Sequence, residues 1–271
     1  MRQKTIKNDI SFSGIGVHSG KYANVYLKPS NPDSGIIISR KGIKFSLFNK
    51  ELNIETHRGT NLIYKNVKIM TVEHFLSAVY MSGITNLEID IDEDEIPVGY
   101  GNAEYFKEIL DKAGMIEQNK EIDIKKIKEK IEIKDKDKFI TIVPYDQYEI
   151  IYTIDYPDTP IGKMTSSFEI NEKTFFEQIG KARTFCLEEE INELYKKGLA
   201  KGGTLENALV VSKTGYSSPL KYPDEPLRHK VLDIVGDLAI TGQYFYAKIE
   251  AVRSGHELNI KLAKKLREIF Y

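Results

Sequence analysis

The segment 228–237 constrains the fold of this chain more than any other stretch, because it carries both an apolar and a polar helix face. Asp224 and Pro226 suit the cap and the first turn of a helix, and Gly242 is typical of a helix end. At 3.6 residues per turn, five apolar side chains form one stripe: Leu227, Val231, Ile234, Val235 and Leu238. The sequence therefore predicts a helix over 225–241 that packs along this stripe.

A polar line runs along another side of the same helix. His229, Asp233 and Asp237 follow one another at intervals of four residues, so their side chains lie one above the other. An imidazole and a carboxylate one turn apart can hold one side of a divalent metal ion. The same spacing is also common on an ordinary solvated helix face. The helix alone leaves both interpretations open.

Composition narrows the class of protein. The 271 residues suffice for one large domain or two of ordinary size. Lys+Arg 39 balance Asp+Glu 40, and the net charge of −1 gives no basic field that would suggest nucleic acid as a partner. The single cysteine, Cys186, excludes an internal disulfide and is typical of a cytoplasmic protein. No apolar run reaches the roughly 18 residues of a membrane span, and the first residues lack a signal-peptide core, so we expect no membrane anchor.

The order of segments predicts strands followed by helices, twice. In the first half, strand-like segments around a glycine-rich turn at 14–20 resemble an antiparallel meander, and helices are predicted at 71–83 and 103–113. Residues 117–138 are rich in Lys, Glu, Asp and Ile and are interpreted as a connector that leads into a new strand. This places a domain boundary near 118–128.

The second half repeats the pattern. Strands are predicted at 139–143, 149–156, 163–170, 209–212 and 244–253, and helices at 172–180, 188–197, 225–241 and 257–270. Strands first and helices after in each half indicate an α+β fold with helices packed on a sheet.

A second candidate for metal chemistry lies at the start of the first-half helix. With Thr71 as the expected cap, Glu73 and His74 fall in the first turn and off the apolar stripe. An acid is favoured there by the helix dipole, so a purely structural role is one alternative. In the other, His74 joins His229 and Asp233 as a two-His, one-carboxylate set with a position open for water, as in catalytic zinc sites, and Glu73 is the base.

Three further side chains are candidates for the site, and two of them, His256 and Lys230, also have a structural interpretation. His256 follows Gly255 at the start of the last helix; such a histidine usually caps or lies at the surface, but it could also protonate a leaving group with Asp237 orienting it. Lys230 is either an ordinary surface lysine or part of the site beside His229. Arg253 is a candidate for a phosphate contact.

An amphipathic segment between 188 and 200 can be core or can line a groove. Its apolar positions are followed by glycines, and an alkyl chain buried there would gain about 0.8 kcal/mol per methylene. The adjoining stretch 201–204 resembles a phosphate-binding loop but lacks P-loop spacing. The apolar positions are Ile191, Leu194, Tyr195 and Leu199.

Together these segments resemble the family of UDP-3-O-acyl-N-acetylglucosamine deacetylases, the zinc amidases that commit cells to lipid A synthesis. The resemblance runs from about residue 4 to residue 270 and rests on six blocks in the family's order. They are Gly14-Ile15-Gly16-Val17-His18-Ser19-Gly20, Thr71-Val72-Glu73-His74-Phe75-Leu76, Ala182-Arg183-Thr184-Phe185, Lys201-Gly202-Gly203, Arg228-His229-Lys230-Val231-Leu232-Asp233-Ile234-Val235-Gly236-Asp237 and Ser254-Gly255-His256-Glu257-Leu258-Asn259.

The resemblance implies a role for each of the polar residues in these blocks. It implies His74, His229 and Asp233 as ligands of one catalytic zinc ion, with Fe²⁺ as the alternative metal, and Glu73 as the general base. The further roles that it implies are His256 as the acid or electrostatic partner, Asp237 as the residue that holds His256, and Thr184 and Lys230 as stabilisers of the tetrahedral oxyanion.

The resemblance also implies how the fold holds the substrate. The family has two similar α/β-sandwich halves, each a sheet layered with helices, with the active site between them; we assign residues 1–122 and 123–271 to these halves. An insert near 188–204 is expected to shape a passage for the acyl chain. Phe185 is expected near the sugar, and Arg253 near the diphosphate.

The expected activity is hydrolysis of the N-acetyl group of UDP-3-O-acyl-N-acetylglucosamine by a cytoplasmic monomer, with at most a transient contact with the inner membrane. Tyr100 departs from the family, which has an acidic residue there, so we expect a rebuilt loop around it and an altered activity. Two alternatives stay open: a zinc hydrolase of another acylated sugar, and a non-catalytic homologue that binds nucleotide sugars or lipids.

Overall fold

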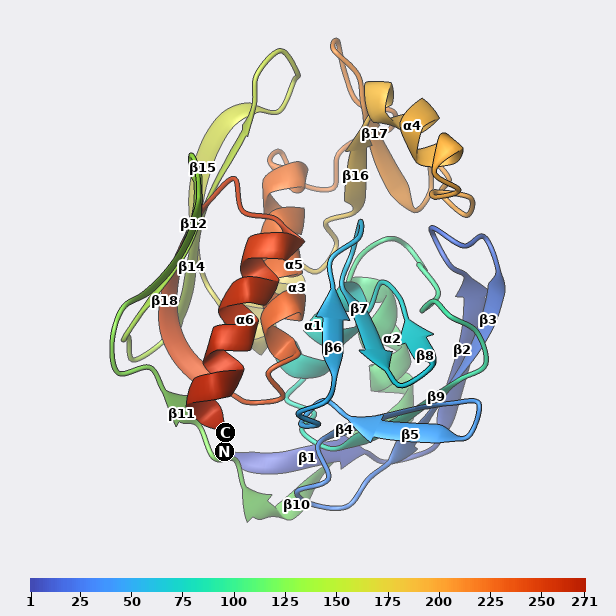
Figure 1. Cartoon of the computed structure of the whole chain (residues 1–271), viewed down its shortest axis with the longest axis vertical. Helices are drawn as coiled ribbons and strands as arrows, with labels where there is room; N and C mark the ends of the chain where they lie inside the picture. Colours follow the sequence, from blue (N-terminus) through green and yellow to red (C-terminus); the bar gives the residue numbers. More distant parts are fainter.

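Two sheets enclose a central layer of helices in the computed structural model, which describes all 271 residues (Figure 1). The first sheet has the order β2-β3-β9-β4-β5, with β2 (Ile10–Ile15), β3 (Tyr22–Pro29), β4 (Ile36–Arg40), β5 (Ile43–Ser46) and β9 (Leu87–Ile91). The second has the order β12-β13-β18-β14-β15, with β12 (Ile131–Asp135), β13 (Lys138–Val143), β14 (Tyr148–Tyr156), β15 (Gly162–Glu169) and β18 (Phe245–Val252), and β11 (Lys125–Lys126) pairs with β18.

The two sheets share one topology. In each, the last strand of the sheet, β9 or β18, inserts between two earlier strands and runs antiparallel to one and parallel to the other. A helix precedes this strand and another follows it: α1 (Glu73–Met81) and α2 (Glu104–Ala113) around β9, and α5 (Glu225–Ala239) and α6 (His256–Phe270) around β18. The predicted α+β fold of two similar halves is confirmed. The division into 1–122 and 123–271 stays a prediction, which this repeat supports.

Two expectations about the strands need correction. The first-half strands do not form a simple meander, because β9 separates β3 from β4. The connector 117–138 does lead into the predicted strand, which is β13, but the connector contains β12, and its first part is also a strand. That strand is β10 (Met115–Glu121), which pairs antiparallel with β1 (Arg2–Ile6).

Each half carries an insertion beside the shared elements. In the first half it is a small sheet of β6 (Asn53–Glu55), β7 (Asn61–Tyr64) and β8 (Val67–Ile69). In the second half, β16 (Thr184–Leu187) pairs in parallel with β17 (Ala208–Val211), and a 3₁₀ turn (Glu188–Glu190) and α4 (Ile191–Lys196) lie between them at the upper end of Figure 1. The remaining helix, α3 (Glu172–Gln178), precedes β16. None of the helices has the length and apolarity that crossing a bilayer requires.

The cap of α1 differs from the expectation. The N-cap residue is Val72, whereas Thr71 has a left-handed φ of 56° and donates its hydroxyl to Glu95 Oε1 at 3.0 Å. Glu95 is buried and also accepts the backbone N–H groups of His18 and Ser19. A buried carboxylate is stabilised by such donors. Because the hydroxyl of Thr71 is bound to Glu95, it does not cap the helix.

Helices α1 and α5 meet at a glycine. The predicted apolar stripe of α5 is buried, and at Gly236 a Cβ atom would lie 2.1 Å from the carbonyl oxygen of Glu73. Only glycine permits this approach, because the obstacle is backbone and cannot rotate away. The contact brings the first turn of α1 against the polar line of α5.

We expect Gly236→Ala to lower the free energy of unfolding by about 3 kcal/mol, since the added methyl must push the two helices apart. Urea unfolding measures the change. Gly215→Ala is the matched control, because a Cβ there meets nothing within 4 Å. Equal stability of the two variants would contradict this account of the helix contact.

Candidate active site

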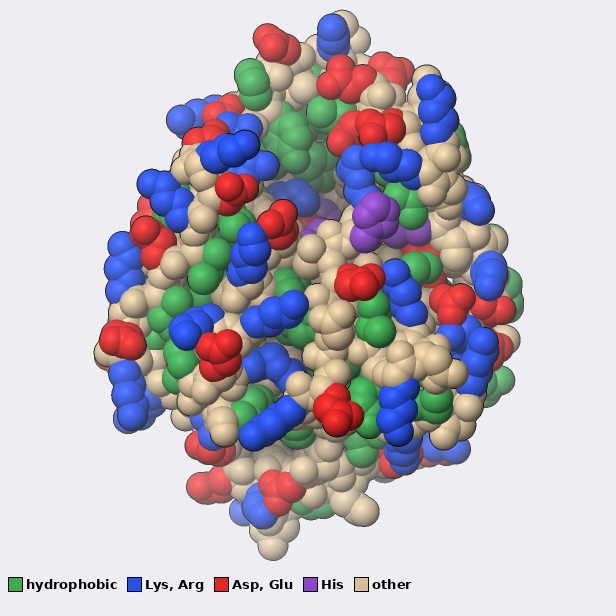
Figure 2. Space-filling model, in the orientation of Figure 1, with side chains coloured by type: hydrophobic (Ala, Val, Ile, Leu, Met, Phe, Trp, Pro, Cys, Tyr) green, Lys and Arg blue, Asp and Glu red, His purple; other side chains and the backbone are tan.

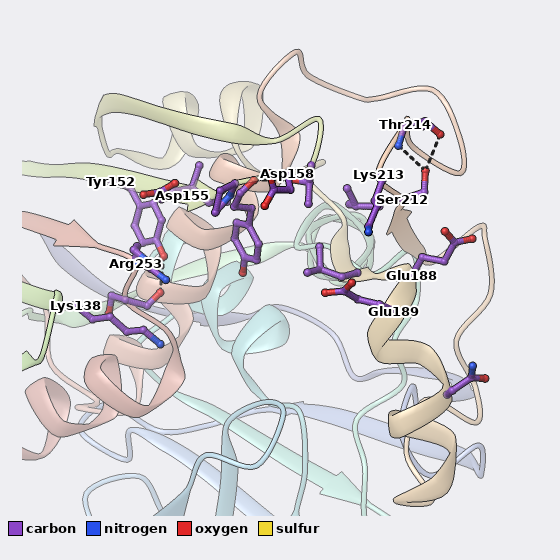
Figure 3. A pocket seen from close by; sticks show the side chains of 18 residues that line it. Lys138, Tyr152, Asp155, Asp158, Glu188, Glu189, Ser212, Lys213, Thr214 and Arg253 are labelled. Atoms are coloured by element: carbon purple, nitrogen blue, oxygen red, sulfur yellow. Dashed lines mark hydrogen bonds between the residues drawn. The ribbon is translucent and has the colours of Figure 1, made fainter.

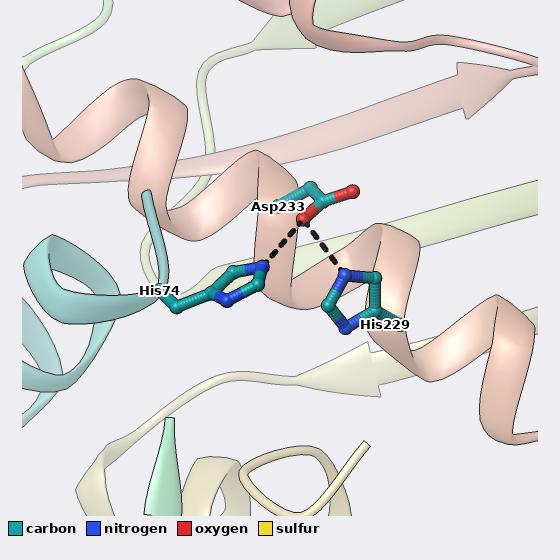
Figure 4. A group of neighbouring side chains, drawn as sticks. All are labelled: His74, His229 and Asp233. Carbon is teal, nitrogen blue, oxygen red and sulfur yellow. Dashed lines mark ion pairs between the residues drawn. The ribbon is translucent and has the colours of Figure 1, made fainter. Parts of the chain in front are cut away.

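Helices α1 and α5 bring together three side chains that could hold a metal ion (Figure 4). His74 comes from the first turn of α1, and His229 and Asp233 come from successive turns of α5. Asp233 Oδ1 lies 3.8 Å from His74 Nε2 and 3.3 Å from His229 Nε2. All three side chains are buried, so the polar line of α5 is not a solvated face.

The donor set fits a divalent cation. Asp233 Oδ1 is buried without a hydrogen-bond partner, although it faces ring nitrogens. The Nδ1 of His229 lies 3.0 Å from the carbonyl oxygen of Ala182, which can only accept, so Nδ1 carries the hydrogen and Nε2 of the neutral ring holds a lone pair. A lone pair and a carboxylate oxygen that face each other in a buried site are stabilised by a cation between them.

Burial keeps both imidazoles neutral. It lowers the pKa of His229, and with the neighbouring His229 ring it lowers the pKa of His74 to about 3. For Asp233, burial alone would raise the pKa, but the charge of Lys230, with that of His256, brings it below its usual range. Neutral imidazoles and an ionised carboxylate are the protonation states that metal binding requires.

Lys230 lies in the site and not on the surface. Its side chain is 19% exposed, and its Nζ lies 2.9 Å from Asp233 Oδ2. This contact occupies the outer oxygen of Asp233 and leaves Oδ1 to face the histidines. The ammonium also lies 5.3 Å from the ring centre of Phe185, within cation–π distance.

Glu73 is buried beside this cluster. Its Oε2 accepts the backbone N–H of Thr60 at 2.9 Å. Burial, assisted by the charges of Asp237 and Asp233, raises the pKa of Glu73 to about 7, against the opposing charge of His256. A carboxyl group with a pKa near neutrality can exchange a proton readily at neutral pH.

His256 and Asp237 form a pair on the other side of the cluster. The Nδ1 of His256 lies 2.9 Å from Asp237 Oδ2 and 3.1 Å from Oδ1. Burial disfavours the charged ring, but Asp237 and Asp233 outweigh it and raise the pKa of His256 to about 10. The ring is therefore an imidazolium that can donate a proton.

A cavity of about 430 Å³ opens onto these groups. One end is polar and the other, formed by the second insertion, is apolar. The polar end includes Glu73, His74, Thr184, Phe185, His229, Lys230, Asp233 and His256, and the apolar end includes Ile191, Leu194, Tyr195, Leu205 and Val210. Figure 2 shows a hollow in this part of the surface, with apolar and histidine side chains in it.

A second cavity, of about 830 Å³, adjoins the first (Figure 3). Lys138 and Arg253 lie on one side of it, and the insertion lies on the other. Phe185 of the first cavity and Tyr156 of the second are in edge-to-face contact, with ring centroids 5.7 Å apart, so the two cavities meet there. Arg253 therefore lies away from the metal-ligand cluster, and it pairs with Asp137.

The expectation about the loop 201–204 is wrong, whereas the expectation about Tyr100 is not tested. The stretch 201–204 does not form a phosphate cradle, because Gly202 donates its N–H to Val17 at 3.0 Å and its Cα packs against the carbonyl of Gly16. Tyr100 lines neither cavity; its side chain is 48% exposed and lies edge-on to Tyr105, with ring centroids 5.1 Å apart. The expectation that Tyr100 alters activity stays a prediction.

Sequence reasoning missed several residues that hold the site. Arg183 forms a buried pair with Glu225 at 2.8 Å and so fixes the adjacent carbonyl of Ala182, the partner of His229. Asn259 donates to Asp237 Oδ2 at 2.8 Å. Arg183 and Asn259 lie within two of the six blocks that resemble the family, so the sequence marked their positions. Thr60 lies in a loop with no periodic pattern, and nothing in the sequence indicated it.

Comparisons with known proteins agree with this geometry. A family model described as UDP-3-O-acyl N-acetylglycosamine deacetylase matches residues 3–268. Curated proteins named UDP-3-O-acyl-N-acetylglucosamine deacetylase are similar along the chain: that of Chlamydia felis is 39% identical over 271 residues, and that of Chlamydia abortus is 38% identical over 272. Each of these two alignments covers 98% of this chain and 97% of the relative.

Proposed function

Because the chain belongs to the UDP-3-O-acyl-N-acetylglucosamine deacetylase family, we propose that it hydrolyses the N-acetyl group of UDP-3-O-acyl-N-acetylglucosamine to a free amine and acetate, the committed step of lipid A synthesis. One observation carries the proposal. The unpartnered Asp233 Oδ1 faces His74 and His229 at the end of a cavity, beside the buried Glu73.

The cofactor in this proposal is one divalent ion, zinc in the first place and Fe²⁺ as the alternative. His74, His229 and Asp233 would hold it, with Ala182 and Lys230 orienting two of these ligands. When bound, such an ion supplies Lewis-acid chemistry, because it polarises the acyl oxygen and makes water acidic enough to ionise near neutral pH.

Proton transfer is assigned to two buried groups whose pKa values are both raised, Glu73 and His256. Glu73 takes a proton from the attacking water, which its pKa of about 7 permits. Once the new C–O bond has formed, His256 gives a proton to the departing nitrogen as the C–N bond breaks, and Asp237 holds the imidazolium in place. Thr184 and Lys230 line the same end of the cavity and would stabilise the negative oxygen between these steps.

The shapes of the two cavities support the substrate assignment. The apolar arm formed by the insertion near 188–204 suits the acyl chain, and the sugar would lie beside Phe185, where the cavities meet. In the larger cavity, the side that carries Lys138 and Arg253 suits the diphosphate, although Asp155, Asp158, Glu188 and Glu189 also line this cavity. A substrate with an alkyl chain and an anionic group on opposite sides of the acetamide would place the chain in the apolar arm and the anionic group beside Lys138 and Arg253.

Acetate release from purified protein tests the proposal. Metal-stripped protein is reloaded with zinc or Fe²⁺ and assayed on the UDP-linked 3-O-acyl sugar and on its non-acylated parent. We expect metal-dependent release and a higher kcat/KM for the acylated compound. Equal rates on both compounds would favour a hydrolase of another acylated sugar, and no release with any divalent ion would favour a non-catalytic homologue.

The setting of the enzyme is part of the proposal. The single cysteine suits a cytoplasmic enzyme, and the monomeric state and the transient membrane contact stay predictions. Sedimentation of the purified protein, alone and with anionic vesicles, would measure both.

A further inference from the structure

Thr60 lies between the two groups to which the proposed function assigns proton transfer. Its backbone N–H donates to Glu73 Oε2 at 2.9 Å, and its hydroxyl donates to Asp237 Oδ1 at 2.5 Å. The side chain is fully buried and lines neither cavity. Thr60 therefore touches both parts of the proton-transfer machinery without touching the space for the substrate.

Asp237 is held from three directions. His256 and Asn259 contact it from α6, and Thr60 contacts it from the loop before β7. The amide of Asn259 is itself oriented by Ser254, whose hydroxyl lies 2.5 Å from Asn259 Oδ1. Because a buried carboxylate is destabilised when a hydrogen-bond donor is missing, each of these contacts limits how Asp237 can rotate.

The loop that carries Thr60 is locked onto α1. The carbonyl oxygen of Thr60 accepts the N–H of Val72 at 3.1 Å. Gly59 has a φ of 152°, and a Cβ there would lie 3.0 Å from Glu73 Oε1. The backbone of this loop thus packs directly on the carboxyl group of Glu73, while the side chain of Thr60 reaches α5.

We propose that Thr60 is a positioning residue that sets the Asp237–His256 pair relative to Glu73. The inference rests on the proposed function for its catalytic meaning. The hydroxyl fixes Asp237 Oδ1, so that the carboxylate keeps both oxygens near His256 Nδ1, Oδ2 at 2.9 Å and Oδ1 at 3.1 Å, and the ring keeps its orientation toward the cavity. The backbone N–H fixes the base at the same time.

A matched pair of variants tests the hydroxyl separately from the backbone. Thr60→Val keeps the shape and the N–H but removes the donor to Asp237, and Thr60→Ser keeps the donor. Loss of an outer hydrogen-bond partner costs about 10–100-fold in comparable sites, so we expect that loss in kcat for Thr60→Val, with KM and metal content unchanged. Thr60→Ser should stay near wild type.

A double-mutant cycle distinguishes positioning from a general structural effect. If Thr60 acts through Asp237 and His256, Thr60→Val should lower kcat much less in a His256→Ala background than in the wild type. An equal loss in both backgrounds, or wild-type kcat for Thr60→Val, would overturn the inference. Should Thr60→Val fail to fold, Thr60→Ala gives the same comparison without crowding the site.

A readout that does not need turnover keeps the two proposals apart. The NMR signal of the His256 Nδ1 proton, assigned by its loss in His256→Ala, should move in Thr60→Val and not in Thr60→Ser. An unmoved signal contradicts the role of Thr60, whatever the activity. Wild-type protein that releases no acetate contradicts the proposed function instead.

Discussion

Glu73→Ala is expected to lose most turnover while it retains the metal. Glu73 is the one carboxyl group at the polar end of the cavity that is neither a candidate ligand nor paired with a cationic side chain, and its pKa of about 7 suits a base. A positioned general base contributes about 10²–10⁴-fold to a rate, which is the loss that we expect in kcat. Metal content should stay near one ion per chain, because His74, His229 and Asp233 remain.

The measurement combines elemental analysis with acetate release on the same sample. Glu73→Gln is the matched variant, since its amide oxygen can still accept the N–H of Thr60 while the group can no longer take a proton. Both variants should fall by a similar factor. Activity near wild type in either would remove Glu73 as the base and, with it, the proton-transfer scheme.

His229→Ala is expected to lose both metal and activity. It removes one of the three proposed protein ligands and leaves the carbonyl of Ala182 without its partner. Loss of an outer partner alone costs about 10–100-fold in metal affinity, and we expect loss of a ligand to cost more. Metal content after dialysis against a weak chelator measures the effect directly.

The exposed His57 gives the control for this variant. His57→Ala removes an imidazole from the surface and should retain metal and rate. The circular dichroism of His229→Ala should match that of wild type, so that loss of metal is not loss of fold. A His229→Ala protein that still holds one tightly bound ion would contradict the proposed ligand set.

The sequence predicted much of the local structure because local structure depends on near neighbours. The apolar stripe on 225–241 predicted α5 to within two residues. The residue types and the four-residue spacing of His229, Asp233 and Asp237 indicated a possible metal site on this helix. The expected Thr71 cap failed for a reason that lies elsewhere in the chain: the buried Glu95 claims its hydroxyl. No local sequence pattern indicated a role for Thr60, because it lies in a loop and its partners belong to helices α1 and α5.

What the sequence by itself determined are the elements of two similar halves and the kinds of side chains that could bind a metal and move protons. Only the tertiary structure decided that His74 meets His229 and Asp233. That meeting depends on the close approach of α1 to α5 at Gly236, and Thr60 joins the same two helices through its hydrogen bonds to Glu73 and Asp237. Periodicity and residue type act within a few positions of the chain, whereas these contacts join segments far apart in sequence through packing, which no local pattern records.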